Sequence, residues 1–107
     1  MLDLATIREA VARVAKANGA VLAVLFGSYA RGTATERSDV DLIFVENTSD
    51  RFLDRLGRYM FPLLDELHEA VELFVYTPAE FEQMKRKPFV GRALREGVVL
   101  YESTRQS

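Results

Sequence analysis

The chain of 107 residues lacks several features that would place it in a specialised class of protein. It contains no cysteine, which excludes disulfides and thiolate metal sites and fits a reducing compartment such as the cytosol. Its longest apolar run, residues 20–26, is far shorter than a membrane span. Its first residues, MLDLATIREA, have neither the basic start nor the apolar core of a signal peptide. From these absences we expect a cytoplasmic protein without a membrane segment.

A broad basic surface is also missing, because the net charge is −2. Proteins that bind nucleic acid over a large area usually carry clustered positive charge, and the sequence shows no strong signal of that kind. A bound nucleotide would therefore need local help, from a metal ion or from the N–H groups at a helix N-terminus.

The composition is that of an ordinary soluble globular protein, with 49% hydrophobic and 28% charged residues. The sequence contains no internal repeat, low-complexity segment or linker. We therefore expect a single domain over residues 1–107, with a frayed tail at 103–107.

Hydrophobic periodicity predicts short, alternating helices and strands. Helices are expected at 3–18, 50–68, 77–87 and 90–95, a short helical turn followed by a loop at 28–37, and strands at 20–26, 39–45, 71–76 and 98–101. Asp3 is a candidate N-cap, Gly19 a candidate left-handed helix end, and Thr77 with Pro78 a helix start. Pro62 is expected to kink or divide its long amphipathic helix. These elements predict an α+β (α/β layered) fold, in which helices pack on a small mixed sheet of about four strands.

Three carboxylates lie in strands that are otherwise apolar. Asp39 and Asp41 are two residues apart, so both side chains project from the same face of their strand. Aspartate is rare in strands, and two such charges repel each other unless a positive charge lies nearby. Glu72 interrupts the apolar segment VELFVY and would join the pair if the two strands are neighbours. The economical explanation is a divalent cation with oxygen ligands, Mg²⁺ or Mn²⁺.

Each carboxylate also has a purely structural interpretation. Asp39 alone could cap a turn, and Glu72 alone could lie at a solvated strand end. Asp41, inside the strand, is harder to explain in this way, and the three together favour a metal site for phosphoryl chemistry.

Gly27 and Ser28 follow a buried strand and open the short helical turn. A glycine lets the backbone approach a phosphate closely, and the serine hydroxyl adds a donor. Gly-Ser after a strand is by itself more often a simple turn, so the motif needs its spacing to carry weight.

That spacing is specific: ten residues separate Gly27-Ser28 from Asp39-Val40-Asp41. The segment GSYARGTATERSDVDLIFV resembles the G-S-x10-D-x-D signature of the DNA polymerase β-like nucleotidyltransferase superfamily, in particular its minimal nucleotidyltransferases. The resemblance extends over nearly the full chain, from the leading helix to the closing segment REGVVLYE.

The resemblance implies a role for each matching residue. Gly27 and Ser28 would bind the β- and γ-phosphates, and Asp39 and Asp41 would hold the metal ions, most simply two Mg²⁺. Glu72 stands where the family usually has aspartate; it would help to bind one metal and activate the attacking hydroxyl. Because glutamate is one methylene longer, this departure puts full activity in doubt.

Several polar and aromatic residues outside the motif also have an interpretation. Arg31 also fits the family's pattern and would reach a phosphate, although a salt bridge that pins the loop is an equal alternative. Tyr29 is interpreted as packing or loop surface, and His68 as a solvated helix end without a functional role. The basic residues 85–87 suit a helix C-terminus, with a partner contact as the minor alternative.

The implied activity is Mg²⁺-dependent transfer of a nucleotide, AMP from ATP, onto a hydroxyl acceptor. Minimal nucleotidyltransferases of this length resemble the antitoxins of toxin–antitoxin pairs, where the acceptor is a tyrosine of a helical HEPN toxin. Two alternatives remain: a module that masks its partner without catalysis, and a transferase that modifies a small molecule. The acceptor, the nucleotide preference and the oligomeric state are not encoded in any recognisable motif.

Overall fold

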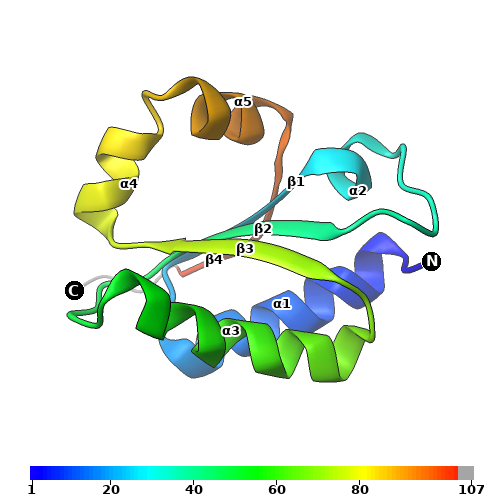
Figure 1. Cartoon of the computed structure of the whole chain (residues 1–107), viewed down its shortest axis with the longest axis horizontal. Coiled ribbons are helices and arrows are strands. Elements are labelled where there is room, and N and C mark those ends of the chain that lie inside the picture. Colours follow the sequence, from blue (N-terminus) through cyan, green and yellow to red (C-terminus); the bar gives the residue numbers. More distant parts are fainter. Residues whose placement is uncertain (104–107) are drawn as a thin grey trace.

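A computed structural model describes residues 1–103 of the chain (Figure 1). Its elements are α1 (Leu4–Asn18), β1 (Leu22–Phe26), α2 (Gly27–Arg31), β2 (Val40–Val45), α3 (Phe52–Leu67), β3 (Val71–Tyr76), α4 (Pro78–Met84), α5 (Pro88–Glu96) and β4 (Val98–Glu102). The strands form one sheet in the order β3-β2-β1-β4. β1 runs antiparallel to β2 and β4, whereas β2 and β3 are parallel, so the sheet is mixed as predicted.

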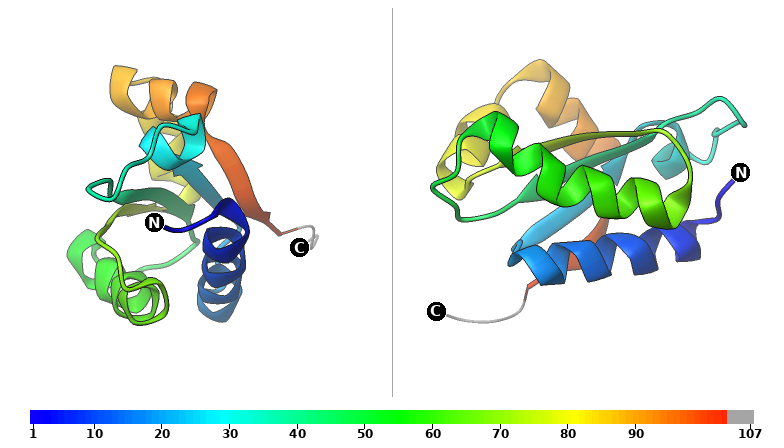
Figure 2. Two further views of the ribbon diagram at one scale, coloured as in Figure 1. Left: turned by 90° about the vertical axis from the view of Figure 1, so that its right-hand side faces the viewer. Right: turned by 60° about the horizontal axis from the view of Figure 1, so that its bottom comes forward.

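The helices lie in layers on the sheet (Figures 1 and 2). α1 and α3 lie side by side on one face, α4 and α5 cover the other, and α2 lies where β1 ends. This is the α+β arrangement that the sequence predicts. No helix within residues 1–103 combines the length and apolar character of a membrane span.

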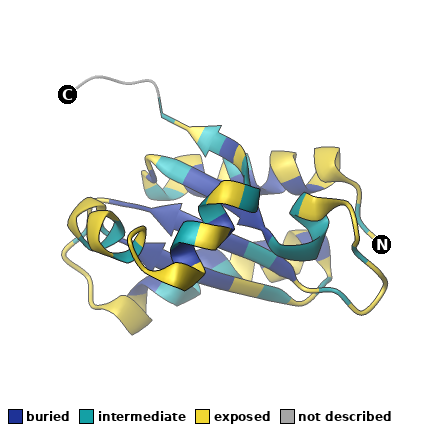
Figure 3. Cartoon of the chain, turned by 90° about the horizontal axis from the view of Figure 1, so that it is seen from above, coloured by how far each residue is buried: buried dark blue, intermediate teal, exposed yellow. Residues whose placement is uncertain are grey.

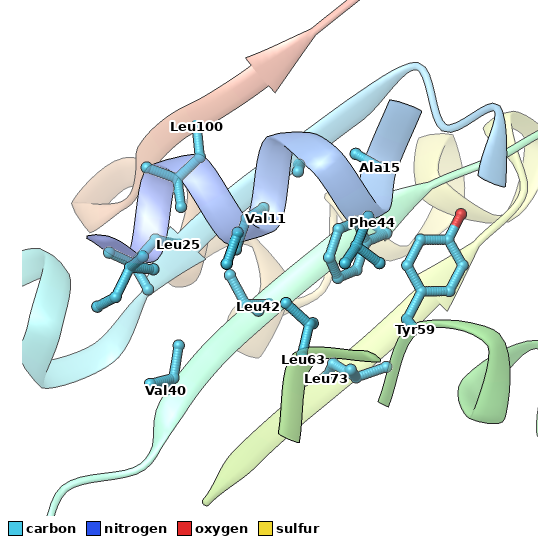
Figure 4. Packing of buried hydrophobic residues seen from close by; sticks show 14 of the residues in the cluster. Val11, Ala15, Leu25, Val40, Leu42, Phe44, Tyr59, Leu63, Leu73 and Leu100 are labelled. Atoms are coloured by element: carbon cyan, nitrogen blue, oxygen red, sulfur yellow. The ribbon is translucent and has the colours of Figure 1, made fainter. Parts of the chain in front are cut away.

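The main core lies between the sheet and the α1–α3 layer, as Figure 4 shows. Val11 of α1, Leu42 and Phe44 of β2, and Tyr59 and Leu63 of α3 are all fully buried there. A second, smaller cluster lies under α5 and contains Phe26, Ile43, Tyr76, Val90 and Ala93. Figure 3 shows burial concentrated on the strands, with exposed residues on the outer sides of the helices. Alternate residues of β2 therefore enter different clusters, which decides the face on which Asp41 lies.

Helix boundaries that depend on local capping were predicted correctly. Asp3 accepts a hydrogen bond from the N–H of Thr6 at 2.8 Å, and Gly19 adopts a left-handed conformation with φ of 76°. Thr77 and Glu80 form a reciprocal capping box at the start of α4.

Several other boundaries differ from the prediction by a few residues. β1 begins at Leu22 rather than at residue 20, and β2 begins at Val40, so Asp39 precedes the strand. The short helix begins at Gly27 and not at residue 28, α4 ends at Met84, and α5 starts already at Pro88. These shifts reflect strand pairing and packing, which periodicity alone does not define.

The prediction of a frayed tail concerns residues 103–107, of which 104–107 lie outside the described residues. Ser103 itself is tied to the sheet, because its N–H donates to the carbonyl of Val21 at 3.0 Å. Fraying does not begin at this residue.

Of the two effects expected of Pro62, division of the helix is wrong, because α3 is continuous from Phe52 to Leu67, whereas a kink stays a prediction. A proline has no N–H, so the carbonyl of Arg58, four residues earlier, loses its helical donor. Asn18 at the end of α1 supplies the replacement, donating its side-chain amide to that carbonyl at 3.2 Å. Arg58 in turn donates to the Asn18 side-chain oxygen at 2.9 Å. A contact between two helices thus satisfies the carbonyl that proline leaves unpaired.

Candidate functional site

The sheet topology brings together one end of three strands. β1 ends where β2 begins because the two are antiparallel, and β3 begins beside β2 because those two are parallel. Asp41 therefore pairs with Phe26 on one side and with Glu72 on the other. Ile43, two residues beyond Asp41, belongs to the cluster under α5, so Asp41 and Glu72 face the α4–α5 side of the sheet. The condition on which the sequence prediction for Glu72 depends, that β3 lies beside β2, is confirmed, and it places Glu72 beside Asp41.

The three carboxylates differ in exposure. Asp41 is partly buried, while Asp39, in the loop before β2, and Glu72, near the start of β3, are exposed. The site is thus one carboxylate held within the sheet and two at its solvent border.

Gly27 lies directly against Asp41. Its φ of 74° is in the left-handed region, which side chains other than glycine rarely adopt. A Cβ placed on Gly27 would overlap Oδ2 of Asp41 and come within 3.1 Å of its Cγ. Only glycine therefore allows the backbone turn after β1 to approach the carboxylate so closely. The turn is closed by the carbonyl of Ser28, which accepts from the N–H of Thr33 at 2.9 Å.

The electrostatics of Asp41 show an excess of negative charge. Burial raises the pKa of Asp41, and the charges of Glu72 and Asp39 raise it further, to about 6, against a smaller opposing effect of Arg31. Among the described residues, the effect of Arg31 does not balance that of the carboxylates, so a bound cation would relieve their repulsion. Oxygen-only donors in this number suit a hard cation such as Mg²⁺ or Mn²⁺.

The donor chemistry therefore fits a divalent metal, with Asp39, Asp41 and Glu72 as the candidate ligands. Within residues 1–103, however, no three acidic or histidine side chains form a ready-made metal cluster. The carboxylates share a region of the surface, but their side chains do not converge on one point.

Arg31, at the end of α2, points toward α5. Its Nη1 lies 3.4 Å from Oε1 of Glu96, an ion pair between two partly exposed side chains. The salt bridge weighed as the alternative for this residue is therefore present. Since Arg31 also lowers the pKa of Asp41, it lies within electrostatic reach of the carboxylates.

A pocket of about 270 Å³ opens beside Gly27, between α2 and α5. Its lining consists of Phe26, Gly27, Arg31, Phe89, Arg92, Ala93 and Glu96. Phe89, Arg92 and Glu96 belong to no motif that could be recognised as a site in the sequence. Their only signal was the amphipathic pattern of a short helix, which gives no information about what that helix covers.

The remaining residues considered from the sequence have structural roles. Tyr29 is partly buried against the main core, as its interpretation as a packing residue predicts. His68 is an exposed, left-handed C-cap of α3. Lys85 caps α4 and pairs with Glu82 at 2.8 Å, so this member of the basic cluster has a partner within its own helix.

The fold and the arrangement of these residues are those of a nucleotidyltransferase domain. A model of the nucleotidyltransferase domain family matches residues 4–100, nearly the whole chain. The protein therefore belongs to the nucleotidyltransferase domain family and is a nucleotidyltransferase enzyme.

Individual relatives agree with this assignment. A segment of 33 residues is 61% identical to the Methanocaldococcus jannaschii protein MJ1305, provisionally named a protein adenylyltransferase. That segment covers 30% of this chain and only 22% of the length of that protein.

Three solved structures share the fold. A toxin–antitoxin crystallised with AMP-PNP has a TM-score of 0.65 and 20% identity, over 91% of this chain and 74% of that chain. A mutant of the MntA–HpeT toxin–antitoxin has a TM-score of 0.64 and 18% identity, over the same shares of the two chains. A provisionally named nucleotidyltransferase from Sulfolobus solfataricus has a TM-score of 0.61 and 22% identity, over 92% and 79%. At these identities the likeness concerns the fold alone.

Proposed function

We propose that this enzyme uses Mg²⁺ to transfer AMP from ATP to a hydroxyl group of a partner protein. The observation that carries the proposal is the contact between Gly27 and Asp41. It joins the glycine-serine turn to a carboxylate that is paired with Glu72 in the sheet. A phosphate-binding turn and an acidic site are thereby combined in one surface, with an unbalanced negative charge that a metal ion would neutralise.

In this proposal the backbone at Gly27 and the hydroxyl of Ser28 bind the β- and γ-phosphates, with Arg31 as a third contact. Asp39, Asp41 and Glu72 would hold Mg²⁺, or Mn²⁺ in its place. The metal would supply charge stabilisation for the triphosphate and for the group that leaves. The acceptor hydroxyl attacks the α-phosphorus in line, a new P–O bond forms, the bond to the β-phosphate oxygen breaks, and pyrophosphate leaves. Glu72, which is exposed at the border of the site, would accept the hydroxyl proton.

The acceptor in this proposal is a tyrosine of a helical toxin of the HEPN class, and the enzyme is its antitoxin. The sequence resemblance to minimal nucleotidyltransferases supports this reading. The names of relatives point in the same direction, since they include a protein adenylyltransferase and toxin–antitoxin complexes.

The test is transfer of a label from ATP to protein. The purified chain is incubated with Mg²⁺, a lysate of the source organism and ATP labelled at the α-phosphate, and a denaturing gel is read. A labelled band is expected with the wild type and absent with Asp39→Asn/Asp41→Asn. ATP labelled at the γ-phosphate should give no band, because pyrophosphate leaves.

A matched control neutralises two exposed aspartates on α3, on the other side of the sheet, as Asp54→Asn/Asp65→Asn. This control should label like the wild type. Equal labelling by the wild type and the Asp39→Asn/Asp41→Asn variant would refute the assignment. Mass spectrometry of the band identifies the acceptor, and a modified side chain other than tyrosine would refute that part alone.

A second candidate is a module that neutralises its partner by masking it, with a weakened active site. Glu72 in place of aspartate and the unconverged carboxylates favour this candidate. It predicts that Asp39→Asn/Asp41→Asn still neutralises the toxin in cells, whereas the enzymatic proposal predicts that neutralisation is lost.

A further inference from the structure

Phe89, the second residue of α5, is 53% exposed yet held firmly in place. Its ring meets the ring of Phe26 edge-on, with centroids 5.7 Å apart and planes at 87°. It meets Phe74 in a similar way, at 5.8 Å and 72°. Two edge contacts fix the ring while leaving part of it open to solvent. An exposed aromatic ring that is already ordered can stack on a flat ligand with little further loss of entropy.

The open ring lines the pocket beside the acidic site. Gly27 belongs to both places, because it lines the pocket and also contacts Asp41. Phe26 connects them in the same way, as the strand partner of Asp41 and the edge contact of Phe89. A ligand in the pocket is therefore continuous with any group bound at Gly27.

The chemistry of the lining argues against a phosphate in the pocket itself. Phe26, Phe89 and Ala93 make one side apolar, and Glu96 places a carboxylate at the rim. That carboxylate is already engaged by Arg92 at 3.2 Å, which reduces what this cation can offer to an anion inside the pocket. An uncharged, flat group with polar edges fits such a lining better than a triphosphate does.

The size of the pocket is also informative. At about 270 Å³ it lies at or below the lower end of the usual range for small-molecule sites, about 300–1,000 Å³. A base with part of its ribose fits this volume, whereas a larger acceptor does not.

We propose that the pocket between α2 and α5 receives the base of the nucleoside triphosphate, with the base stacked on Phe89. This inference rests on the proposed function, because the triphosphate must lie at Gly27 for the base to reach Phe89. It predicts a preference for purine nucleotides over pyrimidine nucleotides, since the larger ring system covers more of the phenyl face. It assigns the pocket to the nucleotide and not to an aromatic side chain of the acceptor.

The chain contains no tryptophan, so Phe89→Trp introduces a single fluorescent reporter at the pocket. Titration with ATP and Mg²⁺ should change its emission with saturation, and tripolyphosphate with Mg²⁺ should not reproduce that change. The matched control is Phe61→Trp, at a phenylalanine that is 73% exposed on α3, on the other face of the sheet. ATP should leave the emission of this control unchanged.

Affinity provides the second readout. Equilibrium dialysis of labelled ATP should show binding that is roughly tenfold weaker for Phe89→Ala and unchanged for Phe61→Ala. Phe89→Leu keeps apolar packing without an aromatic face and should weaken ATP binding almost as much. The affinity for tripolyphosphate, measured by competition, should be the same in all these variants. Circular dichroism confirms that each variant is folded.

The outcomes separate this inference from the proposed function. If Asp39→Asn/Asp41→Asn weakens ATP binding but Phe89→Ala and Phe89→Leu leave it within twofold, the base lies elsewhere and only this inference fails. Normal ATP binding with loss of acceptor labelling in Phe89→Ala would assign the pocket to the acceptor instead and also overturns it. Failure of the wild type to bind any nucleoside triphosphate would overturn both.

Discussion

Replacing Asp41 by asparagine should make the protein more stable while it abolishes nucleotide transfer. Burial and the charges of Glu72 and Asp39 raise the pKa of Asp41 from 3.8 to about 6. A shift of about two pKa units corresponds to about 3 kcal/mol, and the partial exposure of the side chain reduces the expected effect to about 1–2 kcal/mol. Asparagine has nearly the same shape and carries no charge, so it removes the repulsion without leaving a cavity.

The pH dependence gives this prediction its sign. Between pH 3.8 and about 6 the folded state holds a proton on Asp41 that the unfolded state has lost. The free energy of unfolding of the wild type therefore falls, through this group, as the pH rises across that window. Below the window Asp41 is neutral in both states, and the variant should then match the wild type. Above the window, where Asp41 is ionised in both states, Asp41→Asn should have the full gain in the free energy of unfolding over the wild type.

Urea unfolding followed by circular dichroism at pH 8, above the window, and at about pH 3, below it, measures the difference in the free energy of unfolding. With a slope of about 1–3 kcal/mol per molar urea, a gain of about 1–2 kcal/mol should raise the midpoint at pH 8 by about 0.3–2 M. Mg²⁺ should reduce the difference between the urea midpoints of the wild type and Asp41→Asn at pH 8, because it can stabilise the wild type at this site but not the variant. Asp65→Asn, an exposed change on α3, serves as the control and should shift neither midpoint. A variant that is less stable than the wild type at pH 8, or equally shifted at both pH values, would refute the reasoning.

Three further predictions concern other parts of the structure. Urea unfolding measures the free energy of unfolding of each variant, and the label-transfer assay measures the activity of the two glycine variants. Gly27→Ala should cost about 1–3 kcal/mol and abolish transfer, whereas Gly32→Ala should cost about 1–2 kcal/mol and leave transfer intact. Both glycines have a positive φ, 74° at Gly27 and 78° at Gly32, so both alanines are strained. Only at Gly27 would the new Cβ overlap Asp41, because nothing lies within 4 Å of a Cβ at Gly32. An equal loss of transfer activity in the two variants would contradict this account. Asn18→Ala should lower the free energy of unfolding by about 1 kcal/mol. The loss should be smaller in a Pro62→Ala background, where the backbone N–H of residue 62 can again donate to the carbonyl of Arg58. If Asn18→Ala lowers stability equally in the wild type and in the Pro62→Ala background, the side-chain amide of Asn18 does not substitute for the N–H that Pro62 lacks. Glu46→Ala should lower the free energy of unfolding by about 2–3 kcal/mol, because the buried hydroxyl of Tyr59 loses its acceptor and Arg58 keeps only Asn18 and Asp50 among the partners described. A cost below about 1 kcal/mol would contradict this.

Much of the fold could be predicted from local signals. The caps at Asp3, Gly19 and Thr77 are formed by contacts within a few residues, so the sequence shows both partners at once. The strands are recognisable because each is a short apolar segment between breakers. Boundaries that depend on pairing, such as the start of β2 after Asp39, were less well predicted.

The sequence also predicts a chemistry for the site, and the roles of its residues stay a prediction. Gly27, Ser28, Asp39 and Asp41 lie within one short segment, and their spacing is enough to suggest phosphate chemistry with a metal. The sequence could only make the position of Glu72 conditional on the order of the strands. The parallel pairing of β2 with β3 places Glu72 beside Asp41. The two strands are separated in the sequence by α3, so local signals do not show that they are neighbours.

By itself, then, the sequence determined the helices, the strands and the acidic motif, since these depend on residue type and on neighbours a few positions away. Only the tertiary structure decided three other features. It placed the Gly27 backbone against Asp41, it supplied Asn18 to the carbonyl that Pro62 leaves unpaired, and it set Phe89 beside Phe26. Each joins elements that are distant in the chain. Such contacts depend on how whole layers pack, and a helix or strand pattern contains no record of the surface that it will meet.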